Sequence, residues 1–462
     1  MKLKDIIEEY ISGDWGNEDF SPETPCAVYC VRGADIVPIS NDQFNDIPLR
    51  YVSKRTKDNK TLRAGDLVIE KSGGSPVQST GRITYISQEL IDSKQSVVCS
   101  NFCTSIRIKD SWNSKFIYYY WQYIYNSGVF FNFEGKTSGL KNLQFDNAIA
   151  SIDIPEYTLE QQTEIADILS KLESKMTVNR EINRNLEAMT RQLYDYWFVQ
   201  FDFPDENGCP YKSSGGRMVW NEKLSQFIPE CWNVKSVGEI ASLNKSSLSK
   251  KDSLEELLYL DTSNLTLNHI DSLQVVKRSE APSRAQRRVA INTILYSTVR
   301  PRLKHFGIIC SPENNLIAST GFCTINANLL RDSISLYLFL TQETIINKLG
   351  DIADTAVSSY PSIGPTDIES LYICYGPDSL MDLFYQRTSS TFISIEKNEQ
   401  EIKYLQDERD ELLPLLMNGQ VSVMPPEVNC DLYFARCHTF INFEYVILPL
   451  YAADGFFKHS ST

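Results

Sequence analysis

Two similar halves follow each other along the chain, and this internal repeat constrains the fold more than any other feature of the sequence. Residues 101–104 (Asn-Phe-Cys-Thr) are echoed about 220 residues later by residues 321–324 (Gly-Phe-Cys-Thr). An apolar, strand-like run precedes each motif, at residues 96–99 and 316–319. A fixed offset of this kind indicates a fold built from two copies of one unit.

The elements that follow keep the same order in both halves. They are an aromatic segment compatible with a helix, a polar loop and a short alternating strand, at residues 116–125, 135–139 and 150–155 in the first half and 334–340, 356–364 and 369–374 in the second. A long helical pattern begins after each short strand. The sequence therefore predicts an α+β chain made of two mixed domains with an internal pseudo-twofold repeat.

The first long helix has a strong start signal. Thr158 and Gln161 form a capping box, which satisfies amide groups that the first helical turn leaves bare. Apolar residues then recur every three or four positions as far as the aromatic run at 196–198, at Ile165, Ile168, Leu169, Leu172, Met176, Ile182, Leu186, Met189 and Leu193.

The second long helix is expected to begin near Ser379 and to end at Asn418-Gly419, which is a typical stop signal. Each helix could reach about 40 residues, or ~60 Å at 1.5 Å per residue. Narrow apolar stripes of this length are typical of coiled coils, so we expect the two helices to pair antiparallel. The alternative is that each helix packs only on its own domain.

Length and composition favour a modular globular protein. A chain of 462 residues is long enough for two to three domains. The first ten residues lack the apolar run of a signal peptide, and no run of roughly 18 apolar residues occurs, so we expect a cytoplasmic protein. The 11 cysteines form no Cys-x-x-Cys pair and have no histidine at zinc-site spacing, which predicts scattered reduced thiols, mostly buried.

The usual signs of catalysis are missing from the sequence. Residues 74–81 resemble a Gly-rich loop but lack the Gly-Lys-Ser/Thr ending that binds phosphates, so they are interpreted as a turn. No dinucleotide motif occurs, and no Asn/Asp-Pro-Pro-aromatic run of the amino-methyltransferase type. The four histidines are scattered and form no ligand pair. We therefore expect no catalytic residue, no metal site and no cofactor in this chain.

Both long helices resemble those of one family. Residues 155–172 (PEYTLEQQTEIADILSKL), with Asn179-Arg-Glu-Ile-Asn183 and Tyr196-Trp-Phe-Val-Gln-Phe-Asp-Phe-Pro204, are similar to the central repeat of Type I restriction-modification specificity subunits. Residues 405–420 (LQDERDELLPLLMNGQ) resemble the distal repeat of that family. The similarity in organisation covers residues 1 to about 423.

The resemblance implies a non-catalytic subunit that recognises a bipartite DNA target. It implies target-recognition domains at 1–155 and 206–377, conserved-region helices at 156–205 and 378–423, and a tail of unknown role at 424–462. Its partners would be double-stranded DNA, two methyltransferase subunits that use S-adenosylmethionine on adenine, and restriction subunits that use ATP and Mg to translocate and cleave. Two other hypotheses are a self-contained enzyme with a divergent nuclease or methyltransferase centre, and a non-DNA coiled-coil scaffold.

Two departures from the family pattern stand out. The second helix begins with Met381-Asp-Leu-Phe-Tyr-Gln-Arg387, whereas the first has the fuller Leu159-Glu-Gln-Gln-Thr-Glu-Ile165. An apolar tail, including residues 440–451, follows Pro425-Pro426. The tail could be a strand that closes a domain edge, or a read-through or rearranged end.

Two basic stretches stand out in a chain of net charge −14. Residues 50–63 contain six basic residues and one acid, and residues 281–312 contain no acid. Sequence readout needs donors and acceptors at base edges, and affinity comes mostly from phosphate contacts. We therefore expect DNA contacts in these stretches and around the loop at 135–139, from Lys54, Arg55, Lys57, Lys60, Arg63, Lys136, Lys141, Arg284, Arg287, Arg288, Arg300, Arg302 and Lys304. The alternative for each of these residues is an ordinary solvated basic side chain. Partner subunits are expected to contact Leu172, Leu186, Leu193, Trp197, Phe198, Leu405 and Leu412.

Overall fold

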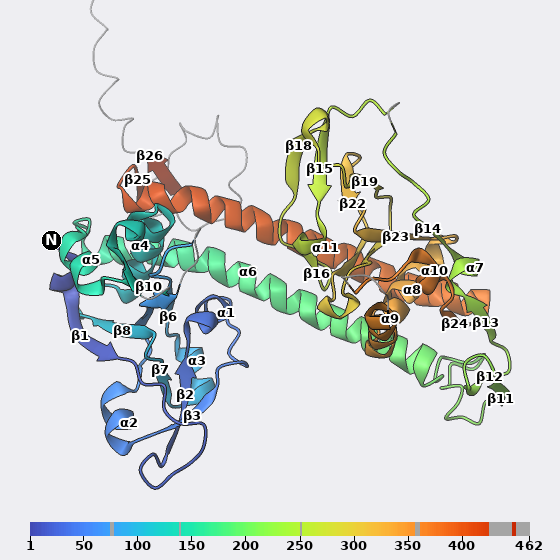
Figure 1. Cartoon of the computed structure of the whole chain (residues 1–462), viewed down its shortest axis with the longest axis horizontal. Coiled ribbons are helices and arrows are strands. Elements are labelled where there is room, and N and C mark those ends of the chain that lie inside the picture. Colours follow the sequence, from blue (N-terminus) through green and yellow to red (C-terminus); the bar gives the residue numbers. More distant parts are fainter. Residues whose placement is uncertain (74–77, 138–139, 250–251, 356–360, 425–445, 450–462) are drawn as a thin grey trace, which may run out of the picture. The chain divides into compact units, whose positions relative to one another are not determined.

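The chain divides into two compact units, each built from two separate stretches of helix and a mixed domain. The computed structural model describes residues 1–73, 78–137, 140–249, 252–355, 361–424 and 446–449 (Figure 1). Unit 1 comprises Met1–Thr177 with Lys403–Thr462, and unit 2 comprises Val178–Ile402. Two long helices, α6 (Leu159–Tyr194) and α11 (Asp378–Met417), each contribute residues to both units.

Unit 1 contains short strands and helices before α6. The helices are η1 (Leu3–Ile6), η2 (Gly33–Asp35), α1 (Ile36–Ser40), α2 (Lys54–Lys60), α3 (Gln88–Lys94), α4 (Ser114–Asn126), η3 (Val129–Phe133) and α5 (Phe145–Ser151). The strands are β1 (Ile7–Ser12), β2 (Cys26–Val31), β3 (Leu49–Val52), β4 (Leu67–Glu70), β5 (Ser72–Gly73), β6 (Ile83–Tyr85), β7 (Val97–Cys99), β8 (Cys103–Ile108), β9 (Glu134–Thr137) and β10 (Leu140–Leu143), followed after α11 by β25 (Val421–Met424) and β26 (Val446–Pro449).

Three sheets form the domain of unit 1. The largest has the order β1-β8-β4-β6 with antiparallel neighbours, and Ser105 of β8 faces Val68 of β4. A second sheet has the order β3-β2-β7, in which β2 and β7 run parallel. Strand β4 is buried along its whole length, as its continuous apolar run requires. Val68, Val97 and Cys99 belong to the apolar core of this domain.

Unit 2 begins with the second part of α6 and ends with the first part of α11. Its helices are η4 (Asp195–Val199), α7 (Val237–Ile240), η5 (Thr262–Asn264), η6 (Arg278–Glu280), η7 (Pro301–Leu303), η8 (Leu330–Asp332), α8 (Ser333–Leu340), α9 (Glu343–Thr355) and α10 (Pro365–Glu369). Its strands are β11 (Met218–Asn221), β12 (Gln226–Pro229), β13 (Asn233–Ser236), β14 (Ala241–Leu243), β15 (Glu256–Leu260), β16 (Leu265–Thr266), β17 (His269–Ile270), β18 (Gln274–Lys277), β19 (Ala285–Arg288), β20 (Thr293–Ser297), β21 (Phe306–Ile309), β22 (Leu316–Ser319), β23 (Phe322–Ala327) and β24 (Tyr372–Tyr375).

The sheets of unit 2 repeat the strand order of unit 1. One sheet has the order β14-β23-β20-β21, again with antiparallel neighbours, which matches β1-β8-β4-β6 strand for strand. A second sheet has the order β18-β15-β22-β19, in which β15 and β22 run parallel as β2 and β7 do. The shared order gives the echoed motifs at 101–104 and 321–324 one structural role, because each leads into the second strand of its sheet.

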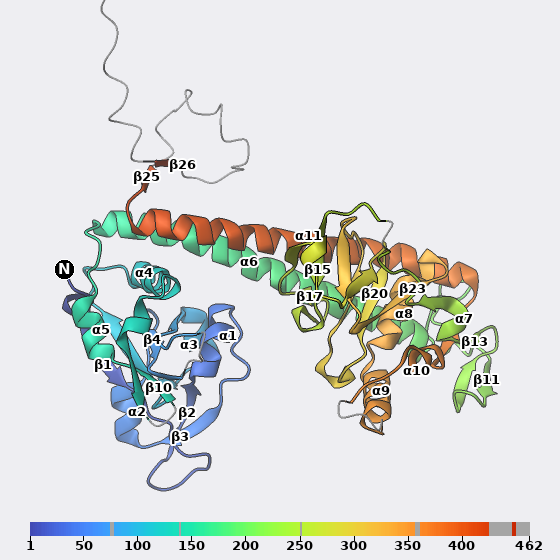
Figure 2. The same cartoon turned by 45° about the horizontal axis from the view of Figure 1, so that its top comes forward.

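In unit 1 the two long helices lie side by side and antiparallel (Figure 2). The predicted capping box at the start of α6 is confirmed, since Thr158 N donates to Gln161 Oε1 (3.0 Å) and Gln161 N to Thr158 Oγ1 (3.2 Å). Close by, the hydroxyl of Tyr157 donates to the carbonyl oxygen of Leu416 (2.8 Å). Helix α11 ends at Met417, directly before the predicted stop at Asn418-Gly419, and Gly419 has a φ of 73° that few other residues adopt readily.

In unit 2 the helices pair antiparallel around one buried polar residue. The side chain of Asn183 is 6% exposed. Its Nδ2 donates to Glu399 Oε1 (2.8 Å) and, at 3.3 Å, to the carbonyl oxygen of Ile395. Its Oδ1 accepts a hydrogen bond from Asn398 Nδ2 (2.8 Å). A buried amide with three partners fixes the register of two paired helices, because any slip leaves it unsatisfied.

Several details of the predicted helices need correction. Ile182 and Met189 were predicted on the apolar stripe of the first helix but are 42% and 65% exposed. A straight α-helix has 3.6 residues per turn, whereas spacings that alternate between three and four residues average 3.5. Over many turns a stripe with that spacing therefore moves away from the face that contacts the partner helix. Helix α11 begins at Asp378, one residue before the predicted cap Ser379.

Two local differences from the sequence prediction remain. Residues 54–60 form helix α2, for which no helix was predicted. The strand predicted at 150–155 does not form, because α5 continues to Ser151 and only Asp153 forms a β-bridge, with Lys2.

Parts of other predicted segments lie outside the described residues. These are residues 74–77 of the expected turn, 138–139 and 356–360 of the two polar loops, and most of the tail. Strand β26 of the tail pairs antiparallel with β25 in a separate two-stranded sheet, so these strands do not extend a sheet of either domain. No helix among the described residues combines the length and apolar character needed to cross a bilayer.

The buried Asn183 yields a test of the helix pairing. Replacing Asn183 by alanine removes the hydrogen bonds that its amide forms with Glu399 Oε1 and Asn398 Nδ2, so the free energy of unfolding should fall by roughly 1–3 kcal/mol. Asn185, exposed on the same helix, is the matched control, and its alanine variant should differ from wild type by less than about 0.5 kcal/mol. Urea unfolding of both variants measures the difference, and equal effects would contradict the role of Asn183.

A second test concerns His269, which joins the β16–β17 hairpin to α11. Its Nδ1 lies 2.7 Å from Glu399 Oε2, and this hydrogen bond, with the charges of Glu399 and Asp271, raises the pKa of His269 against the opposing effects of burial and of Arg180. The raised pKa stabilises the fold below the ordinary histidine pKa of about 6.5, and this contribution is lost as the pH rises through the folded-state pKa. His269→Gln should therefore lower the thermal midpoint at about pH 5.5 more than at about pH 8.5. A pH-independent difference would contradict this account.

Candidate nucleic-acid interface

The predicted DNA contacts fall at two equivalent places in each unit. The first place, which we call the outer basic segment, is residues 53–66 between β3 and β4 and residues 278–292 between β18 and β20. The second place, which we call the inner turn, is the segment that follows strand β4 in unit 1 and strand β20 in unit 2. It pairs with the segment before α5 in unit 1 and with the segment before α10 in unit 2. In unit 1 Ser72 pairs with Asn142, and in unit 2 Val299 forms a bridge with Ser362.

The outer basic segment of unit 1 is folded around the helix α2. Ser53 caps this helix by accepting a hydrogen bond from Thr56 N (3.1 Å). Lys54, Arg55 and, just beyond the helix, Arg63 are exposed, and Lys57 is half-buried. None of these four side chains has an ion-pair partner among the described residues, so their charges are available to an anion.

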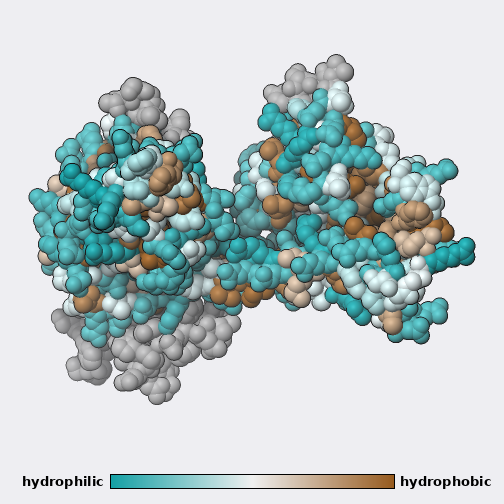
Figure 3. All heavy atoms as spheres, turned by 90° about the horizontal axis from the view of Figure 1, so that it is seen from below, coloured by the Kyte–Doolittle hydropathy of each residue, from teal (hydrophilic) through white to brown (hydrophobic). Residues whose placement is uncertain are grey.

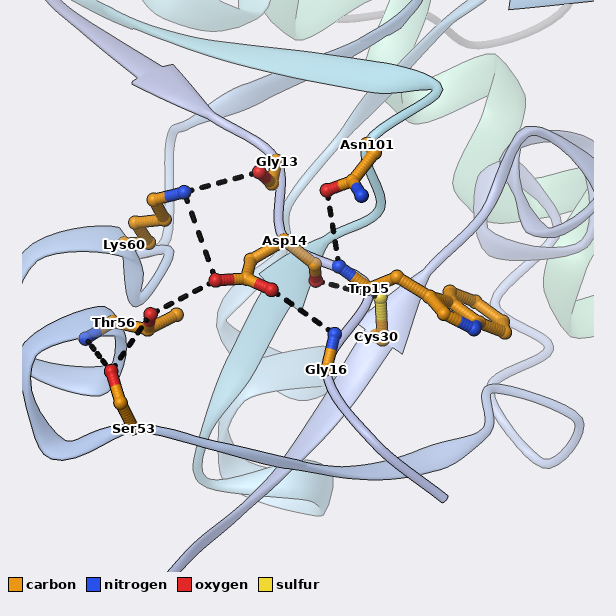
Figure 4. A network of polar contacts seen from close by, with 9 residues as sticks. All are labelled: Gly13, Asp14, Trp15, Gly16, Cys30, Ser53, Thr56, Lys60 and Asn101. Carbon is orange, nitrogen blue, oxygen red and sulfur yellow. Dashed lines mark hydrogen bonds and ion pairs between the residues drawn. The ribbon is translucent and has the colours of Figure 1, made fainter. Parts of the chain in front are cut away.

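A network centred on Asp14 attaches α2 to the end of β1 (Figure 4). Asp14 Oδ2 accepts a hydrogen bond from Thr56 Oγ1 (2.9 Å) and lies 3.8 Å from Lys60 Nζ. Lys60 Nζ also donates to the carbonyl oxygen of Gly13 (3.1 Å), and Trp15 N donates to Asn101 Oδ1 (3.2 Å). Lys60 therefore positions the helix, which distinguishes it from the other basic residues of α2.

In unit 2 the outer basic segment is a strand rather than a helix. Arg287 and Arg288, which were predicted on a loop, belong to β19, and Arg284 directly precedes that strand. Arg284 is exposed, whereas Arg288 pairs with Asp252 (2.8 Å). Arg287 is half-buried, and its Nε has no hydrogen-bond partner within the described structure.

The segment that pairs with the inner turn of unit 1 carries two of the predicted lysines. Lys136 lies in β9, and nothing is described of its side chain. Lys141 in β10 forms an ion pair with Glu134 (3.0 Å), and its Nζ lies 5.2 Å from the ring centroid of Phe131. Lys141 is thus partly neutralised by a neighbour on the adjacent strand.

The inner turn of unit 2 holds the other three candidates. Arg302 pairs with both Asp351 and Asp354 of α9, each at 2.5 Å, and Lys304 pairs with Glu343. Arg300 is exposed and has no partner among the described residues. The stretch at 281–312 lacks acids of its own, but acids from distant parts of the chain neutralise three of its six predicted contacts. Sequence reasoning missed these acids because no local signal marks them.

Residues expected to face partner subunits are largely inside the chain. Trp197 and Phe198 are 2% and 5% exposed and belong to the core of unit 2, where both rings contact Phe384. Leu172, Leu405 and Leu412 are buried in unit 1, and Leu186 and Leu193 are half-buried against the core of unit 2. The expectation of a partner surface at Trp197 and Phe198 is therefore corrected, since their burial stabilises this chain.

The cysteines agree with the prediction of free thiols within the described residues. Six of the nine described cysteines are buried, and all nine are free. Burial raises the pKa of the Cys30, Cys310 and Cys323 thiols to about 12, so these groups stay protonated and are poor nucleophiles. The described part of the chain contains no group of three or more His, Cys, Asp or Glu residues arranged for a metal ion.

The surface is consistent with polar recognition. On the face seen in Figure 3 hydrophilic side chains predominate over both units, and hydrophobic ones form small separate groups. The geometry therefore offers exposed basic groups at the outer basic segments and at Arg300, all supported by buried sheets. Such an arrangement suits contacts to phosphates and base edges.

Comparison with known proteins shows similarity to one family. Residues 35–188 match the family described as Type I restriction modification DNA specificity domain. The chain is 22% identical over 446 residues to the Type I restriction enzyme MjaIX specificity subunit of Methanocaldococcus jannaschii, covering 91% of this chain and 93% of that protein. It is 21% identical over 341 residues to the Type I restriction enzyme HindI specificity subunit of Haemophilus influenzae, covering 62% and 73%.

A solved structure shares the fold. The crystal structure of the Type I restriction-modification system S subunit from M. genitalium superposes with a TM-score of 0.53 at 15% identity, covering 90% of this chain and 95% of that one. The matched domain and the relatives agree with the resemblance seen in the two long helices. Over most of its length the chain is therefore similar to specificity subunits of Type I restriction-modification systems, and its residues 35–188 match their DNA specificity domain.

Proposed function

We propose that this chain recognises a bipartite DNA target, with one half read by the domain of unit 1 and the other by the domain of unit 2. The observation that carries the proposal is the strand order β1-β8-β4-β6, which recurs as β14-β23-β20-β21. Two domains of the same construction offer two recognition surfaces of the same kind. Two such surfaces in one chain suit a target made of two separate half-sites.

Chemistry on the DNA belongs to partner subunits in this proposal. As a specificity subunit the chain is the non-catalytic member of its system. Two methyltransferase subunits would methylate adenine with S-adenosylmethionine, and restriction subunits would translocate and cleave with ATP and Mg. The chain itself directs both activities to one sequence.

Phosphate and base contacts are assigned to the exposed basic residues. Lys54, Arg55, Lys57 and Arg63 in unit 1, and Arg284 in unit 2, have no ion-pair partner among the described residues and suit phosphate binding. Four other basic residues now form ion pairs with carboxylates and would have to leave them before binding a phosphate; these are Arg288, Arg302, Lys141 and Lys304. The scaffold and self-contained enzyme hypotheses are not favoured, because the matched family is a DNA specificity domain.

Domain exchange tests whether each unit reads its own half-site. Replacing residues 206–375 by the matching segment of another specificity subunit should change only one half of the methylated motif, because the domain of unit 1 and both long helices stay unchanged. The measurement is genomic methylation mapping in a host that also expresses the methyltransferase partner. The reciprocal control exchanges residues 1–155 and should change only the other half, so a change in both halves would contradict the proposal.

Charge removal on α2 tests the phosphate contacts. The triple variant Lys54→Gln, Arg55→Gln and Lys57→Gln should lower the slope of log K against log salt by up to ~2.7, since each lost phosphate contact contributes ~0.9. The methylated motif should stay the same, because phosphate contacts carry no sequence information.

The matched control for this test is Lys54→Arg, Arg55→Lys and Lys57→Arg, which keeps all three charges and should keep the wild-type slope. DNA binding of the assembled complex, measured over a range of salt concentrations, separates the two triple variants. If the glutamine variant keeps the wild-type slope, α2 does not contact DNA phosphates.

A further inference from the structure

The inner turn of unit 2, residues 299–304, has an unusual backbone. Arg300 and Lys304 flank the short helix η7, and their φ angles are 47° and 58°. Residues other than glycine rarely adopt this left-handed region, and they remain in it only where the surroundings fix them. Strained backbone of this kind is concentrated at functional sites.

Main-chain contacts fix the turn on two sides. Arg300 N donates to the carbonyl oxygen of Pro361 (3.0 Å). On the other side, Leu267 N in the β16–β17 hairpin donates to the carbonyl oxygen of Lys304 (3.0 Å). Between them Pro301 is buried and is the first residue of η7. The turn therefore keeps its conformation without help from a ligand.

The side chains of Arg302 and Lys304 hold the same turn against α9. The Arg302 guanidinium lies between Asp351 and Asp354 and directly over Gly350. A Cβ on Gly350 would lie 2.6 Å from Arg302 Cζ, so this helical position must be glycine for the guanidinium to approach. Lys304 pairs with Glu343 at the start of the same helix. Both basic residues act as positioning residues within the protein.

Three exposed side chains of the turn remain free for a ligand. The side chain of Arg300 is exposed and has no partner among the described residues. Val299 and Leu303 are 39% and 52% exposed, although valine and leucine are usually buried. A fixed turn that exposes one unpaired guanidinium beside apolar side chains suits a base edge, where hydrogen-bond acceptors and methyl groups lie side by side.

We infer that Arg300 reads a guanine in the half-site recognised by unit 2, and that Arg302 and Lys304 position it. This inference rests on the proposed function. Arginine donates two parallel hydrogen bonds to guanine O6 and N7, which no other base offers in that arrangement. Leu303 contacts the neighbouring base by its apolar surface. Because the turn is already formed, little ordering of the backbone opposes binding.

The test uses the full chain assembled with its methyltransferase partner. Arg300→Ala should abolish the preference for guanine at one position of one half-site, a change of roughly 10- to 100-fold in discrimination. Arg300→Lys keeps the charge but loses the two-pronged geometry, so it should lose the same preference while it binds more tightly than the alanine variant. Methylation mapping gives the motif, and equilibrium binding to duplexes substituted at each position gives the discrimination.

The matched control is Arg184→Ala, which removes an exposed arginine from α6 in the same unit and should leave the motif unchanged. Arg302→Ala tests positioning and should weaken discrimination at the same base pair as Arg300→Ala and at no other. Selectivity like wild type in both Arg300 variants would overturn the inference, and so would equal weakening on every duplex, which indicates a phosphate contact. Neither result affects the proposed function, which fails only if methylation by the wild-type complex does not follow a bipartite motif set by this chain.

Discussion

The antiparallel pairing of α6 with α11 is the interaction on which both units depend. In unit 1 Tyr157 donates to the carbonyl oxygen of Leu416, and in unit 2 Asn183 bonds with Glu399 and Asn398. The paired segments are separated by more than 200 residues of chain, so neither unit is complete until the second helix has been added. The domain of unit 1 also contacts this helix pair, because the hydroxyl of Tyr119 in α4 donates a hydrogen bond to Glu173 in α6. Helix pairing and domain packing are therefore one cooperative system within each unit.

Sequence patterns predicted the repeat and both helices because these features have strong local or periodic signals. Thr158 with Gln161, and the Asn418-Gly419 stop, act through the backbone next to them and need no tertiary information. Helix α2 was missed because its seven residues contain no apolar periodicity, and its stability comes from the Ser53 cap and from Asp14 on another element. Tertiary contacts decide the structure of such short polar segments.

Sequence patterns located the basic side chains of the candidate site but not the partner of each one. The acid-free stretch at 281–312 contains the inner turn of unit 2. Asp252, Glu343, Asp351 and Asp354 lie far from it in sequence and nevertheless pair with its basic side chains. Counting charges along the chain therefore overestimates how many of them a ligand can use. Only the folded structure separates Arg300 from Arg302.

Internal neutralisation has a consequence for specificity. A protein of net charge −14 repels DNA at long range, and ion pairs such as Arg302 with Asp351 leave fewer charges for the backbone of any sequence. Non-specific binding comes almost entirely from phosphate contacts, so it weakens with each basic residue held by a carboxylate. Contacts to base edges are not weakened in the same way, because they depend on the geometry of residues such as Arg300. Pairing arginines within the protein thus lowers general affinity for DNA and raises the ratio between specific and non-specific binding, which is the quantity a specificity subunit must provide.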